Sequence, residues 1–108
     1  MEDLLKIFSA LGNDTRFRIT MMLQHKDMCV CEIRNVIGSS MSTVSNHLKI
    51  LKDAKIISSH KDDKYVTYFL NRKYDYFSEI LEIIKNVDDD ILLRDKEIVI
   101  KTERNIVC

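Results

Sequence analysis

The sequence predicts a small, mainly α-helical domain with one β-hairpin, an α+β fold. Apolar residues recur at helical spacing in five stretches before residue 88. Gly38 separates two of these stretches in the manner of a helix-turn-helix. The segments 56–60 and 65–70 are rich in β-branched and aromatic residues and flank the polar turn 61–64. Helices, glycine turn, helix and hairpin in this order predict a winged helix-turn-helix.

Length and composition indicate one globular domain. The chain has 108 residues, is 45% hydrophobic and contains no low-complexity tract. We expect residues 1–87 to form the domain and residues 88–108 to be a C-terminal extension of it. No apolar run approaches the roughly 20 residues that span a bilayer, and the N-terminus lacks a signal-peptide pattern. We therefore expect a cytoplasmic protein, with no membrane partner and with its cysteines mostly reduced.

The first two helices are predicted from spacing and capping. Leu4, Phe8 and Leu11 share one helical face, and Gly12 stops that helix. Asn13 is a suitable N-cap for the second helix, whose apolar side chains are Phe17, Ile19, Met22 and Leu23.

The predicted helix-turn-helix follows a short β-like segment at 28–30. Its first helix covers 31–37 and ends at Gly38, a candidate left-handed C-cap. Ser39 or Ser40 caps the next helix, which runs to about Ala54. The buried stripe of this helix is Val44, Leu48 and Leu51.

A fifth helix is expected from about Tyr74 to Val87, with Phe77, Ile80, Leu81 and Ile84 on one face. The acidic run 88–90 ends or loosens it. Apolar residues beyond it repeat at seven-residue intervals, although 98–100 also has strand propensity. We predict a weakly held helical extension there.

Positive charge is concentrated around the fourth helix, although the whole chain has zero formal net charge. Between residues 33 and 61 there are five basic side chains and one acidic side chain. Short polar side chains on this helix would let its backbone approach base edges in a major groove, and Asn46 can pair bidentately with adenine. The candidate DNA contacts are Met41, Ser42, Thr43, Ser45, Asn46, His47, Lys49 and, on the hairpin, Lys61 and Lys64. The alternative is a solvated polar face on a protein of another kind.

Two thiols, Cys29 and Cys31, lie just before this motif and suggest that chemistry at sulfur alters DNA binding. Thiolates favour soft ions such as As(III), Sb(III), Cd(II), Pb(II) or Cu(I). Two ligands are too few for a closed site, and Cys108 is the remaining thiol, from the same or a partner subunit. Three alternatives stay open: small buried hydrophobes, a redox switch in which Cys29 or Cys31 oxidises, and a thiol redox or metal-carrier protein that does not bind DNA. No pattern of an enzyme active site is present.

Three separated segments, 8–19, 29–33 and 42–48, resemble the ArsR/SmtB family, and the resemblance extends over roughly residues 4–87. It implies a homodimeric repressor that binds an imperfect palindromic operator and leaves it on binding a metal or metalloid, and it implies no enzyme. It also implies that Cys29 and Cys31 form the thiolate site, with arsenite-type ions as the first choice and Cd(II) or Pb(II) next.

The same resemblance leaves two other sites in doubt. Arsenic-sensing relatives often carry a third cysteine where this chain has Arg34, and cadmium- or lead-sensing relatives use an N-terminal cysteine that is absent here. No histidine follows His60, which disfavours the family's zinc site on the fifth helix, and His47 is expected to pack or to contact a phosphate.

The resemblance implies dimerisation through the first and fifth helices, by faces that contain Leu4, Phe8, Phe77, Ile80, Leu81 and Ile84.

Overall fold

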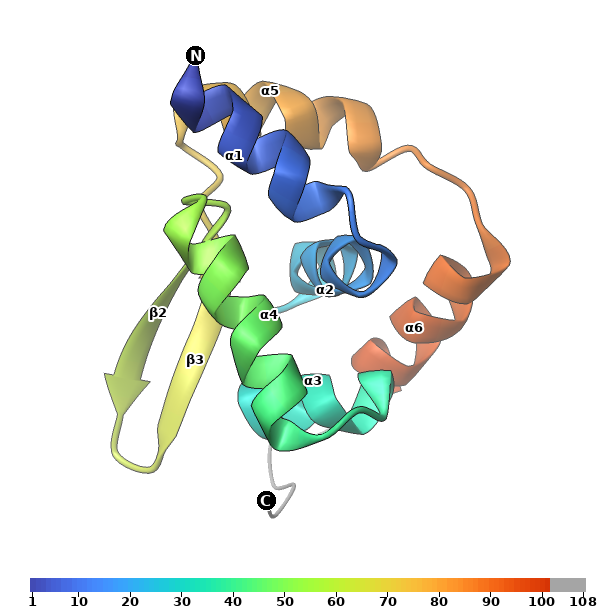
Figure 1. Cartoon of the computed structure of the whole chain (residues 1–108). Coiled ribbons are helices and arrows are strands. Elements are labelled where there is room, and N and C mark those ends of the chain that lie inside the picture. Colours follow the sequence, from blue (N-terminus) through green and yellow to red (C-terminus); the bar gives the residue numbers. More distant parts are fainter. Residues whose placement is uncertain (102–108) are drawn as a thin grey trace.

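The computed structural model describes residues 1–101, and residues 102–108, including Cys108, lie outside the described part. The helices are α1 (Glu2–Leu11), α2 (Asp14–His25), α3 (Val30–Ile37), α4 (Met41–Asp53), α5 (Asp75–Ile84) and α6 (Asp90–Lys101); the strands are β1 (Met28–Cys29), β2 (Ile57–Asp62) and β3 (Tyr65–Leu70) (Figure 1). Helix α2 lies at the centre, with α1, α3, α4 and α6 around it. None of the described helices is long and apolar enough to cross a membrane.

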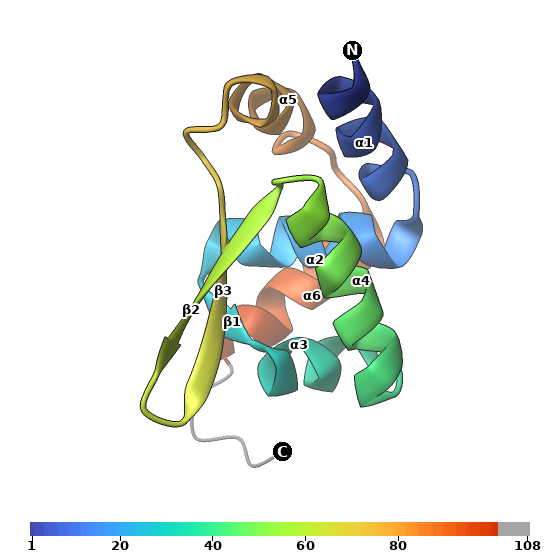
Figure 2. The same cartoon turned by 60° about the vertical axis from the view of Figure 1, so that its left-hand side comes forward.

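The three strands form one antiparallel sheet in the order β1-β3-β2. Ile57 is opposite Leu70 at the base of the hairpin and Asp62 is opposite Tyr65 at its tip, so the hairpin projects from the helices as a wing (Figure 2). The connecting turn contains only residues 63 and 64. The predicted four-residue turn is therefore wrong, and Lys61 lies within β2, because cross-strand pairing continues into the polar segment.

Local signals begin and end these helices as predicted. The Asn13 side chain accepts the backbone N–H of Arg16 at 3.1 Å and caps α2. The hydroxyl of Ser40 accepts the N–H of Thr43 at 3.2 Å and caps α4. Gly38 has φ 84°, a left-handed conformation that costs glycine little.

The core combines the inner faces of all six described helices with the wing base. Its fully buried members include Ile7, Ile19, Leu23, Ile33, Val44, Leu48, Leu51, Ile57, Phe77 and Val99. On α1 the fully buried side chains are Ile7 and Ala10, whereas Phe8 is exposed. Phe77 and Leu81 are buried within the subunit, so their predicted place in a dimer face is wrong. The physical reason is that this small subunit needs them for its own core.

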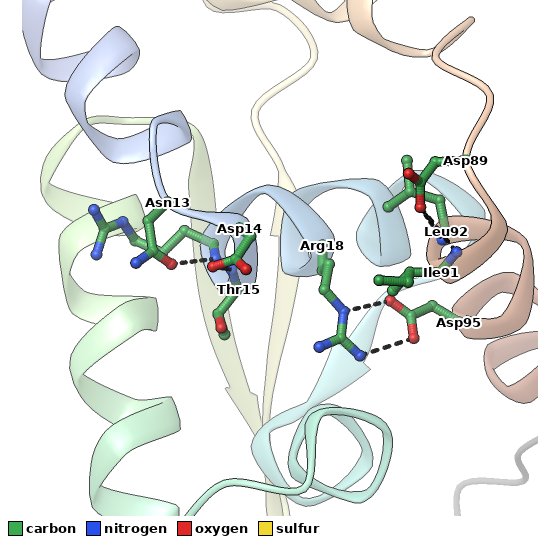
Figure 3. A network of polar contacts seen from close by, with 9 residues as sticks. Asn13, Asp14, Thr15, Arg18, Asp89, Ile91, Leu92 and Asp95 are labelled. Carbon is green, nitrogen blue, oxygen red and sulfur yellow. Dashed lines mark hydrogen bonds and ion pairs between the residues drawn. The ribbon is translucent and has the colours of Figure 1, made fainter.

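Helix α6 is held by a buried ion pair. The Arg18 guanidinium donates from Nε to one oxygen of Asp95 at 2.8 Å and from Nη2 to the other at 3.0 Å (Figure 3). The Asp95 side chain is 2% exposed. Asp89 accepts the N–H of Ile91 at 2.8 Å at the start of the helix. The helix is confirmed, but the expectation of a weakly held extension is wrong, because Asp95 finds a partner 77 positions away in the chain.

Candidate DNA-binding face and thiol site

Helix α4 presents a polar face to solvent because its apolar stripe is used by the core. Ser42, Thr43, Ser45, Asn46 and Lys49 are exposed. Met41 and His47 are partly buried at the edges of this face. The side chains on this face are mostly short hydroxyls and an amide, which can reach base edges without holding the backbone away from DNA.

The basic side chains predicted around α4 have different roles in the structure. Lys61 and Lys64 are exposed on the wing, as a phosphate contact requires. Lys52 donates to the Ser59 hydroxyl at 2.8 Å and joins the end of α4 to β2. The Lys55 ammonium lies 5.6 Å from the centre of the Tyr74 ring. Two of the lysines therefore position the wing and its base.

His47 is a polar side chain of α4 that contacts another helix. Its Nδ1 lies 3.3 Å from Nη1 of Arg16 on α2. Burial and the nearby Arg16 charge lower the pKa of His47, while Asp14 opposes them. The sequence suggested packing or a phosphate contact for His47. It carried no signal for Arg16, which is 31 positions away in the chain.

Cys29 is the N-cap of α3, and its thiol is part of a capping box. The backbone N–H of Glu32 points to the Cys29 sulfur, and the Glu32 carboxylate accepts the Cys29 N–H at 3.0 Å. This reciprocal pairing satisfies two donors at the start of the helix. Cys29 is 2% exposed and Cys31 is 6% exposed.

The surroundings of the Cys29 thiol disfavour its thiolate. Burial raises the pKa of Cys29, the Glu32 N–H lowers it, and the Glu32 carboxylate raises it further. Glu32 is itself buried, with Lys26 Nζ at 3.7 Å from Oε2, the carboxylate oxygen that does not accept the Cys29 N–H. Sequence reasoning did not foresee that the Glu32 carboxylate caps Cys29.

The two cysteines differ in redox state. Cys29 is a free thiol, whereas Cys31 is disulfide-bonded. The expectation of mostly reduced thiols rests on the redox state of the cytoplasm and stays a prediction. Within residues 1–101 no three His, Cys, Asp or Glu side chains are grouped to hold a metal. The expected third ligand, Cys108, lies outside the described residues.

Apolar side chains remain exposed at one end of the molecule, where α1 and α5 lie near each other in both views (Figures 1 and 2). Leu5 and Phe8 on α1, and Tyr76 and Ile83 on α5, are all exposed. Ile80 and Ile84 pack partly against the core. The exposed apolar face of α5 is therefore centred on Tyr76 and Ile83 and is rotated around the helix axis from the predicted face.

The fold, the polar helix and the wing define a winged helix-turn-helix DNA-binding regulator. A family model described as "Bacterial regulatory protein, arsR family" matches residues 13–59. The cadmium resistance transcriptional regulatory protein CadC of Listeria innocua is 37% identical over 79% of this chain and 71% of its own. The arsenical resistance operon repressor of Staphylococcus xylosus is 28% identical over 81% of this chain and 85% of its own.

Solved structures agree at the level of the fold. Reduced HlyU from Vibrio cholerae superposes with a TM-score of 0.66 at 23% identity, covering 80% of this chain and 92% of its own. The chain belongs to the ArsR family. It is a DNA-binding transcriptional repressor and not an enzyme.

Proposed function

We propose that this repressor leaves its operator when a thiophilic metal ion or metalloid binds Cys29 and Cys31. One observation carries the proposal: Cys29 is at once a candidate ligand and the N-cap of α3. A sulfur that binds an ion can no longer accept the Glu32 N–H in the same way. Ligand binding and the helix start therefore compete for one sulfur atom.

The spacing of the cysteines adds to this competition. Cys31 is two residues beyond the cap, and side chains at that spacing on a helix point to different sides. Bringing both sulfurs to one ion requires the first turn of α3 to change its backbone conformation. Since α3 packs against α4, the change reaches the proposed recognition helix. Reciprocity requires bound DNA to weaken ion binding by the same factor.

Two ions with different ligand preferences, As(III) and Cd(II), are the candidates for this site. As(III) is our first candidate because it prefers sulfur, although two cysteines leave a position for Cys108 or a small thiol. Cd(II) is the second, since it is a soft cation that thiolates favour and the buried Glu32 carboxylate lies beside Cys29. The relatives named above are associated with cadmium and with arsenicals, one each.

We further propose that a cytoplasmic homodimer reads an imperfect palindrome. The exposed apolar side chains of α1 and α5, Phe8 and Ile83 among them, would form the interface. Two α4 helices would then enter successive major grooves. Thr43 and Asn46 would contact bases, and Lys49, Lys61 and Lys64 would contact phosphates.

Operator release by added ions tests the thiol site directly. A duplex that binds the wild-type protein is first selected from a randomised pool and labelled. The fluorescence anisotropy of this duplex with bound protein is then followed under reducing conditions. As(III), Sb(III), Cd(II), Pb(II) and Zn(II) are added separately. We expect Cys29→Ser and Cys31→Ser to bind DNA but to lose release by the active ion. Equal release of wild type and Cys29→Ser at the same ion concentration would exclude the site.

A redox switch is the second candidate, and it is favoured by the disulfide at Cys31. Two thiols would lose two electrons and two protons to peroxide, which is reduced to two waters. The disulfide sulfur cannot also act as a thiolate ligand, so the two switches exclude each other. If peroxide releases the reduced protein from DNA and none of the ions does, the redox function replaces the metal one.

A further inference from the structure

Arg16 joins three helices through one guanidinium. Its Nε donates to the backbone oxygen of Ala10 at 2.7 Å, and Nη2 donates to that of Ser9 at 3.4 Å, both at the C-terminal end of α1. Its Nη1 lies 3.3 Å from Nδ1 of His47 on α4. Arg16 itself lies in the first turn of α2. The dimerisation helix proposed above and the proposed recognition helix are thus linked through a single side chain.

This link depends on the charge of His47. A guanidinium has donors and no acceptor, so Nδ1 of His47 must accept, and the ring proton must be on Nε2. A doubly protonated ring has no acceptor and would bring two cations together at this distance. The charged groups that shift the pKa of His47 are Arg16, which lowers it, and Asp14, which raises it, and both are on α2. Burial is the largest cause of the lowered pKa.

We propose that Arg16 is a positioning residue that fixes the recognition helix against the end of α1, and that this link exists only while His47 is neutral. The proposal rests on the assignment of α4 as the operator-reading helix. Its consequence is that one hydrogen bond adds to the direct packing of α1 on α4 in setting the relative placement of these helices, and hence of the two recognition helices in a dimer. DNA binding by this repressor then becomes sensitive to acid.

The expected sign follows from the proton balance. The Arg16–His47 hydrogen bond forms in the folded protein only with a neutral imidazole. The link is therefore fully present above the ordinary imidazole pKa of about 6.5. It is lost as pH falls through the lower pKa of the folded state. Protonation also adds a positive charge, which strengthens binding to any DNA. The ratio of affinity for the selected duplex to affinity for a scrambled duplex therefore isolates the positioning effect, and we expect this ratio to fall about tenfold when the link is lost.

The first test is an NMR titration of the histidine rings in the free, reduced protein. Replacing Arg16 by Met removes the donor and the positive charge, so the pKa of His47 should rise towards its ordinary value. Arg94→Met, an exposed arginine on α6, is the matched control and should leave His47 unchanged. If Arg16→Met also leaves the His47 titration unchanged, the proposed link is absent.

The second test uses His47→Asn, because Oδ1 of asparagine occupies the same position along the side chain as Nδ1 of histidine and accepts without titrating. We expect the selectivity of this variant, the ratio of its affinity for the selected duplex to its affinity for a scrambled duplex, to be equal at pH ~7.5 and pH ~5.5, on the two sides of the imidazole pKa. His47→Leu, which lacks an acceptor, should lose selectivity at both. His60→Gln, an exposed histidine on the wing, should keep the acid sensitivity of wild type. Acid sensitivity that persists in His47→Asn would overturn the proposal.

A third variant, Asn46→Ala, separates this proposal from the assignment of α4 as the reading helix. If Asn46→Ala leaves affinity and sequence preference unchanged, α4 is not the reading helix, whatever the His47 titration shows. If Asn46→Ala relaxes specificity while Arg16→Met leaves both His47 and selectivity unchanged, α4 reads DNA and the link does not position it.

Discussion

Removing Arg18 should destabilise the protein more than removing its partner, Asp95. The carboxylate of Asp95 is 2% exposed and the side chain of Arg18 is 19% exposed. Arg18→Met leaves a buried carboxylate with neither counterion nor donors among residues 1–101, for which a loss of about 3–5 kcal/mol is typical. Asp95→Leu leaves a guanidinium that can turn towards solvent along a flexible side chain, so we expect a smaller loss of about 1–2 kcal/mol.

The double variant Arg18→Met/Asp95→Leu sharpens this prediction. A buried ion pair replaced by apolar side chains of similar size is often neutral. We therefore expect the double variant to be more stable than Arg18→Met alone. Urea unfolding followed by circular dichroism, at one fixed protein concentration because a dimer links stability to concentration, measures all four proteins. A loss below about 1 kcal/mol for Arg18→Met, or a double variant that shows the sum of the two single losses, would refute the reasoning.

Three further predictions concern DNA, assembly and the backbone. Asn46→Ala should cost about 1–3 kcal/mol of operator binding and relax sequence preference at one base position. Lys64→Ala should instead weaken binding to all sequences and flatten the salt dependence of binding. Anisotropy titrations at several salt concentrations distinguish the two effects. Ile83→Glu should dissociate the proposed dimer without disturbing the core, since Ile83 is 74% exposed; a dimer that persists in sedimentation would show that this face is not the interface. Lys55 has φ 62°, so Lys55→Gly should be about 1 kcal/mol more stable than Lys55→Ala in urea unfolding, because only glycine adopts this conformation without strain.

The fold was predictable because its signals are local. A capping side chain, a left-handed glycine or an apolar stripe acts within a few residues, as Asn13, Gly38 and Ser40 do in α2, α3 and α4. The polar face of α4 follows in the same way, since Val44, Leu48 and Leu51 turn the remaining side chains outward. The segment 98–100, which has both helical and strand propensity, was settled as helix by packing on α2.

The two sulfurs of the candidate thiol site could be identified from the sequence, but the groups that surround them could not. The spacing of Cys29 and Cys31 is visible in the chain, but the burial that raises the pKa of Cys29 depends on β1 joining the wing. The identity of the cap also depends on that strand, because Cys29 is the last residue of β1 and the N-cap of α3.

Residue types and their spacing, by themselves, determined the helices, the hairpin, the polar face of α4 and the position of the thiol pair. Only the tertiary structure decided that Phe77 belongs to the core, that Asp95 binds Arg18, and that Arg16 meets His47. The physical reason is the range of the interactions. Helix caps and apolar periodicity act between neighbours, whereas burial and ion pairing depend on which distant segments pack together, and several partners of suitable charge or size compete for each of those positions in the unfolded chain.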